Sequence, residues 1–115
     1  MKKVLIVFAM LLPQLALADH SLLDAVEMST EVMAAVEGLQ RTNKVRCDLA
    51  NSNQASGDAY EEGGIRIMTS TQIARCKPSG SIRVSYKQAQ QWTGPESDEV
   101  LVSEVWTITE ASYQK

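Results

Sequence analysis

The sequence predicts an α+β fold in which one N-terminal amphipathic helix packs on a four-stranded antiparallel sheet. Three observations support this fold class. Apolar residues recur at helical spacing from Ser21 to about Asn43, the segments after Asn43 alternate between apolar and polar residues, and Gly- and Pro-containing turns separate those segments. Because short turns join neighbouring strands, the sheet should be antiparallel and should form one layer against the helix.

The first 18 residues read as a secretory signal peptide. Lys2 and Lys3 precede an uncharged apolar run, and Ala16-Leu17-Ala18 carries small residues where signal peptidase cuts. Cleavage there leaves Asp19 as the first residue of the mature chain. The alternative is a membrane anchor, but residues 4–18 include Pro13 and fall short of the roughly 20 apolar residues that a spanning helix needs. We therefore expect a periplasmic or secreted protein without a membrane span after cleavage.

The mature chain, residues 19–115, has the size of a single small domain. Its 97 residues are too few for two hydrophobic cores. It carries 9 basic and 14 acidic side chains, a formal charge of -5. Because an acidic surface repels phosphate groups and anionic lipids, we expect no nucleic-acid ligand. The oligomeric state is left open.

The predicted helix begins with a capping box formed by Ser21 and Asp24. Its apolar residues follow steps of three and four, and it should end near Arg41 to Asn43 after about five turns. A dimer seam and a membrane-surface helix are the alternatives to packing on the sheet. The polar face of the helix is acidic, whereas helices that bind membrane surfaces are usually basic, so core packing is favoured.

Four strands are predicted after the helix. Turns are expected at Lys77-Pro78-Ser79-Gly80 and at residues 93–97, because Pro and Gly supply the backbone angles that turns need. The strands should occupy residues 45–49, 65–76, 81–92 and 99–111. The predicted apolar faces are Val45, Cys47 and Leu49; Ile65, Ile67 and Ile73; and Ile82, Val84 and Tyr86. The last strand has apolar residues on both sides, which favours a central or doubly covered position.

The two cysteines, Cys47 and Cys76, are predicted to form a structural disulfide. An exported chain meets an oxidising compartment, where two thiols within reach are normally joined. A redox motif would need C-x-x-C spacing, and a zinc site would need four ligands, whereas the chain has two cysteines and one histidine. Free or intermolecular thiols are the remaining alternative.

The sequence offers no plausible catalytic set. The one histidine, His20, stands at the start of the mature chain, and Gly63-Gly64 lacks the spacing and the lysine of a phosphate-binding loop. We expect no enzyme activity, no metal and no cofactor, although an enzyme that works through carboxylates alone stays open. Two metal sites are weaker alternatives: calcium at Asp58, Glu61 and Glu62, and copper at the amino terminus beside His20.

A long polar segment, residues 51–64, is predicted to be a loop that binds a partner. It has three glycines and no apolar period, and it exceeds the usual length of a connection. The surface that it forms with the turn after Trp92 should contact a protein. The candidate residues are Tyr60, Glu61, Glu62 and Trp92. The alternative for Trp92 is that it closes the open end of the core.

Together these features favour a small exported binding protein of bacterial type that is not an enzyme. Inhibitor, immunity factor and envelope accessory factor are roles that fit such a chain, and the expected ligand is a protein in the cell envelope. The alternative is a structural subunit of an envelope assembly, in which sheet edges or the apolar stripe of the helix join copies.

Overall fold

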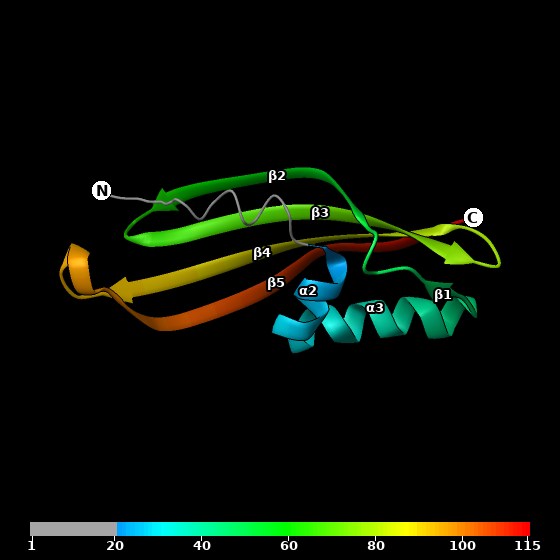
Figure 1. Ribbon diagram of the computed structural model, residues 1–115, viewed down its shortest axis with the longest axis horizontal. Helices are drawn as coiled ribbons and strands as arrows, with labels where there is room; N and C mark the ends of the chain where they lie inside the picture. Colours follow the sequence, from blue (N-terminus) through cyan, green and yellow to red (C-terminus); the bar gives the residue numbers. More distant parts are fainter. Residues whose placement is uncertain (1–20) are drawn as a thin grey trace.

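The computed structural model describes residues 21–115, so the predicted signal peptide, its cleavage site and His20 lie outside the described residues. Two helices precede an antiparallel sheet (Figure 1). The helices are α2 (Leu22–Met28) and α3 (Thr30–Asn43), and the strands are β1 (Arg46–Cys47), β2 (Asn53–Glu62), β3 (Ile65–Lys77), β4 (Ser81–Thr93) and β5 (Val100–Gln114). A short 3-10 helix, η1 (Glu96–Asp98), lies between β4 and β5.

The sheet has the order β2-β3-β4-β5, and the short β1 pairs with the same side of β3 beyond the start of β2. Every pairing is antiparallel. The predicted α+β class, a helical N-terminal part on an antiparallel sheet, is therefore confirmed. The two open edges of the sheet are β2 with β1 on one side and β5 on the other.

The prediction of a single continuous helix is wrong, because the chain leaves the helical conformation at Ser29. This residue is extended (φ -140°, ψ 122°) and ends α2 while it caps α3. Its hydroxyl oxygen accepts a hydrogen bond from the Val32 amide at 3.2 Å, and such side-chain caps compete with helix continuation. The predicted capping box at Ser21 and Asp24 is present at the start of α2. Among residues 21–115, no helix has the length and apolar character needed to span a bilayer.

The helices cover only part of the sheet. The 14 residues of α3 span about 21 Å, whereas the 13 residues of β4 span about 43 Å. The molecule measures 50 × 21 × 19 Å, and the long strands β2 to β5 continue well beyond the helices at one end (Figure 1). The sheet therefore has a half that is packed against α2 and α3 and a half that is not.

The hydrophobic core lies between the helices and the covered half of the sheet. The helices contribute Leu22, Ala25, Val32 and Val36, β4 contributes Ile82, Val84 and Tyr86, and β3 contributes Ala74 and Cys76. The predicted core face of β4 is confirmed. Burial of these side chains supplies the main driving force for packing the helices on the sheet.

The predicted apolar face of β3 does not face the helices. Gln72, Ala74 and Cys76 occupy the core side, so the isoleucines at 65, 67 and 73 lie on the opposite face. Gln72 is fully buried, and its side-chain oxygen accepts a hydrogen bond from the Ser52 hydroxyl at 2.9 Å. Ser52 Oγ in turn accepts a bond from the Leu22 amide at 2.7 Å. The buried polar residue therefore ties the first turn of α2 to the sheet.

The predicted loop at residues 51–64 is wrong, because most of it forms strand β2. All ten residues of β2 are exposed, and their pairing with β3 runs from Asn53 opposite Ile73 to Glu62 opposite Ile65. The strand is held by backbone hydrogen bonds along the edge of the sheet. Without a buried face it has no apolar alternation, which is why its sequence resembles a loop. Similarly, the predicted strand at 45–49 is reduced to the two residues of β1.

The predicted position of the last strand is also wrong. β5 pairs with β4 alone and forms an open edge of the sheet, instead of a central or doubly covered strand. Trp106, Ile108 and Tyr113 pack against the core, but the apolar residues near its start are exposed.

The disulfide prediction is confirmed. Cys47 of β1 lies directly opposite Cys76 of β3, and their sulfurs are bonded. The predicted turn follows at once: β3 ends at Lys77, β4 begins at Ser81, and the Cys76 amide donates to the Gly80 carbonyl at 2.9 Å. Gly80 has a φ of +87°, a conformation that glycine adopts without steric cost.

Candidate interaction surface

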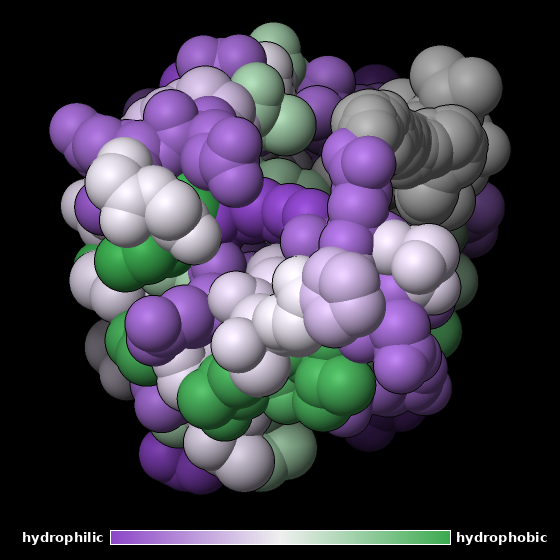
Figure 2. Space-filling view, turned by 90° about the vertical axis from the view of Figure 1, so that its left-hand side faces the viewer, coloured by the Kyte–Doolittle hydropathy of each residue, from purple (hydrophilic) through white to green (hydrophobic). Residues whose placement is uncertain are grey.

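The part of the sheet that extends beyond the helices is the candidate functional surface, and we call it the distal half. It comprises residues 58–69 and 87–107, which are the end of β2, the start of β3, the end of β4, η1 and the start of β5. Figure 2, which looks onto this end of the molecule, shows green apolar residues at the surface among purple polar ones. In this part of the sheet the edge strands β2 and β5 have no outer partner strand among the described residues.

The distal half carries most of the negative charge. It contains seven carboxylates (Asp58, Glu61, Glu62, Glu96, Asp98, Glu99 and Glu104) and two basic side chains (Arg66 and Lys87), a formal charge of -5. The remaining described residues contain six acidic and seven basic side chains, a formal charge of +1. The distal half therefore attracts positively charged ligands, whereas the rest of the described chain is close to neutral.

The face of the distal half that is continuous with the core carries an aromatic and charged cluster. The Arg66 guanidinium lies over the Trp92 ring at 5.2 Å from its centroid and forms an ion pair with Glu99 at 2.6 Å. The Trp92 indole donates to the Gln90 side chain at 3.2 Å. Arg66 of β3 therefore contacts both β4, through Trp92, and the residue between η1 and β5, Glu99. The Trp92 side chain is partly exposed at this contact.

Glu104 of β5 accepts hydrogen bonds from two glutamines of β4. Gln90 donates at 2.7 Å, and Gln88 donates to the same oxygen. Partial burial alone would raise the pKa of Glu104. The hydrogen-bonding side chains of Gln90, Gln88 and Trp106 have the opposite and larger combined effect, so the net pKa is below the ordinary value. The carboxylate is therefore charged at neutral pH and remains part of the negative surface.

Trp106 marks the boundary between the core and the distal half. Its ring packs against Tyr86 with centroids 5.5 Å apart, and within residues 21–115 its buried indole nitrogen forms no hydrogen bond of normal geometry. Burial raises the pKa of Tyr86, although hydrogen bonds to Ser70 and Gln72 oppose this change. Tyr86 therefore stays a neutral phenol.

The opposite face of the distal half carries a row of apolar residues across the four strands. The register places Tyr60, Ile67, Ala89 and Val105 side by side. Residues that face each other across antiparallel strands share one face of the sheet. Tyr60 is 44% exposed and Val105 is 57% exposed, so both ends of this row are open to solvent.

The start of β5 exposes the largest group of apolar residues on the sheet edge. Val100 and Val102 are each 58% exposed, and Leu101 is 40% exposed. Single exposed apolar residues are common on protein surfaces, whereas a contiguous group often marks an interaction site. Here the group coincides with a strand whose outer side has no partner strand among the described residues.

All four residues that the sequence predicted for partner binding lie in the distal half, but on two faces. Register places Glu61 and Trp92 on the face that carries Arg66, and Tyr60 and Glu62 on the opposite face. The structure therefore does not gather them into one cluster. Trp92 lies beyond the core cluster and stacks with Arg66, so it does not close the core as the alternative supposed.

Sequence reasoning missed the residues of β5 and the contact between Arg66 and Trp92. The run from Val100 to Val105 was visible as apolar residues on both sides of one strand. That pattern indicates a doubly covered strand or an exposed interaction strand, and sequence alone does not separate the two. Arg66 has no distinguishing sequence signal, because its stacking depends on the register between β3 and β4.

The predicted metal alternatives gain no support from the described residues. Across residues 21–115, no group of three His, Cys, Asp or Glu side chains is arranged to hold a metal ion. The proposed calcium ligands divide between two faces, because Asp58 and Glu62 alternate with Glu61 along β2.

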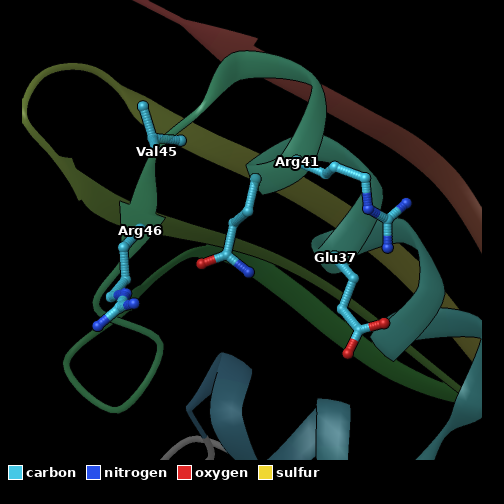
Figure 3. Close-up of a pocket in the computed structure, with 5 residues that line it drawn as sticks. Glu37, Arg41, Val45 and Arg46 are labelled. Atoms are coloured by element: carbon cyan, nitrogen blue, oxygen red, sulfur yellow. The ribbon is translucent and has the colours of Figure 1, made fainter.

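A hollow lies at the other end of the molecule, beside the end of α3. It has a volume of about 370 Å³ and is lined by Glu37, Gln40, Arg41, Val45 and Arg46. Figure 3 shows Glu37 and Arg41 on α3 to one side and Val45 and Arg46 to the other. The Gln40 side chain accepts a hydrogen bond from the Cys47 amide at 2.8 Å, which fixes it to β1. The hollow is wide open and mixes both charges, so we assign it no ligand.

Comparisons of the chain with protein families, curated proteins and solved structures find no match.

Proposed function

We propose that the chain is a small exported binding protein that is not an enzyme and that its distal half binds a protein partner. The observation that carries this proposal is the exposed apolar start of β5 on an open sheet edge beyond the helices. Protein interfaces combine apolar and aromatic residues at their centre with polar residues around them. The distal half offers the same combination through Val102, Trp92 and the surrounding carboxylates.

The expected location is the periplasm or the extracellular space. The Cys47–Cys76 disulfide supports this location, because disulfides persist in oxidising compartments. The basic residues and apolar run at the start of the sequence are typical of a secretory signal. A role as inhibitor, immunity factor or envelope accessory factor is consistent with an exported chain of this size.

The second candidate is a structural subunit of an envelope assembly. It is favoured by the two open edges, β2 and β5, of one sheet. Charge argues against it, because part of each edge lies in the distal half with its formal charge of -5. Copies that joined through these edges would bring like charges together. We therefore rank partner binding first.

We expect two distal variants, Trp92→Ala and Val102→Lys, to weaken retention of the partner at least about fivefold. The purified mature chain is immobilised, exposed to envelope extract of the cells that make it, and the retained proteins are quantified by mass spectrometry. Both side chains are at least partly exposed, so the free energy of unfolding should change by less than about 1 kcal/mol.

The matched control is Met28→Lys, which introduces the same charge at a side chain that is 52% exposed on α2. It should retain the partner as the unmodified protein does. Equal retention by all three variants would remove the distal half from consideration. Concentration-dependent self-association on size exclusion, without a retained partner, would support the structural subunit instead.

A further inference from the structure

The edge strand β5 contains a regular segment bounded by two irregularities. The register with β4 shifts between Gln91 and Trp92 and again between Ser85 and Tyr86. These shifts place extra residues on β5 at Val102 and Thr109, whereas Ser103 to Ile108 pair with β4 without interruption. Bulges of this kind end or redirect strand pairing, so they define a stretch of about 20 Å where another strand fits.

This segment lacks two of the usual protections of an edge strand, lysine and proline, and its one charged residue, Glu104, is hydrogen-bonded to β4. Natural edges are often blocked by lysine, proline or inward-pointing charge. Residues 103–108 have the sequence Ser-Glu-Val-Trp-Thr-Ile, without lysine or proline, and Val105 is 57% exposed on the outer row. β2, the other edge, has Asp58, Glu61 and Glu62 in its last five residues. β5 is therefore the edge better suited to accept a strand.

The charge around β5 decides which kind of strand fits. The distal half has a formal charge of -5, and Glu104 lies within the regular segment and keeps its negative charge at neutral pH. A second copy that paired with residues 103–108 of β5 would bring its own Glu104 close to the Glu104 of the first copy. The repulsion disfavours this arrangement, whereas lysines or arginines on an incoming strand would be attracted.

We propose that β5 binds an extended basic and apolar segment of a partner protein by strand addition along residues 103–108. This inference rests on the proposed function and specifies the mode of binding and the chemistry of the partner. Backbone groups of the incoming segment hydrogen-bond with the open edge, as in other complexes formed by strand addition. Its apolar side chains contact Val105 on one face, and its basic side chains lie near Glu104.

The test uses three synthetic peptides. One alternates valine and lysine, the second has glutamate in place of every lysine, and the third is the valine-lysine peptide with alternate backbone amides methylated. We expect the first to bind at least about tenfold more tightly than either of the others at low salt, and to lose affinity as salt rises. Binding is measured by calorimetry, and hydrogen exchange should show new protection in residues 103–108.

A pair of variants fixes the position of the site. Val105→Lys adds a repelling charge within the regular segment and should weaken binding of the valine-lysine peptide at least about tenfold. Met28→Lys adds the same charge to α2 and should leave the affinity unchanged. Similar affinity of all three peptides, protection confined to β2 or the helices, or dimerisation through β5 would each overturn the proposal.

The outcomes also separate this inference from the proposed function. If distal variants release the partner while the valine-lysine peptide fails to bind, the binding surface stands and strand addition is wrong. If the peptide binds to β5 but distal variants retain the partner, the edge accepts strands and the proposed function is wrong.

Discussion

Replacement of both cysteines by alanine is expected to lower the free energy of unfolding by about 3.6 kcal/mol, the largest change that we predict. The bond joins residues separated by 29 positions, and the entropy of the unfolded chain rises when such a loop is released. Domains are typically stable by about 5 to 15 kcal/mol, so this loss is a large fraction of the total.

The position of the disulfide gives a second reason for a large effect. β1 pairs with β3 through Arg46 and Cys47 only, and the Cys47 amide donates to Gln40 of α3. The bond therefore holds the end of α3 and the short β1 against the sheet. Urea unfolding of Cys47→Ala with Cys76→Ala should match that of the reduced unmodified protein. A loss below about 1 kcal/mol would contradict this role.

The second large effect is expected for Ile82→Ala. Ile82 is fully buried (0% exposed) and belongs to the core between β4 and the helices. Truncation removes three carbons and leaves a cavity that the surrounding side chains fill only in part, so the free energy of unfolding should fall by about 3 kcal/mol. Urea unfolding of the oxidised protein measures this change.

The control for this prediction is Val100→Ala, which shortens a side chain that is 58% exposed at the start of β5. Its free energy of unfolding should change by less than about 0.5 kcal/mol. A small effect of Ile82→Ala, similar to that of the control, would mean that the helices do not pack on β4 as described.

The covered half of the fold was largely predictable because its sequence pattern has one physical cause. Ile82, Val84 and Tyr86 alternate because only one face of β4 is buried against the helices. The capping box at Ser21 and the turn at Gly80 depend on local backbone geometry, which neighbouring residues determine. The disulfide followed from the cysteine count and the expected compartment.

The other elements depend on interactions between distant residues. β2 is a strand because its backbone pairs with β3, and its exposed side chains carry no pattern that reveals this. The isoleucines of β3 alternate as expected, yet the buried Gln72 takes the core side because Ser52 satisfies its side chain. The break between α2 and α3 comes from the local cap at Ser29. The helical spacing of apolar residues continues across Ser29, so it does not reveal the break.

The candidate site was predicted in part. Tyr60, Glu61, Glu62 and Trp92 were selected as residues of a loop and a turn, and they lie at the distal half for a different reason, which is the length of the strands. The open edge of β5 could not be predicted, because sequence does not state the strand order. Its apolar residues on both sides fitted a covered strand equally well.

The most direct test of the distal half as the binding surface is site-specific photo-crosslinking in the cells that make the protein. A photoreactive amino acid is placed at Val102 on β5 and, in a separate variant, at Met28 on α2, where exposure is similar. We predict that the Val102 position forms a defined crosslink to a second protein and that the Met28 position does not. A crosslink of equal yield from both positions, or from Met28 alone, would contradict the account.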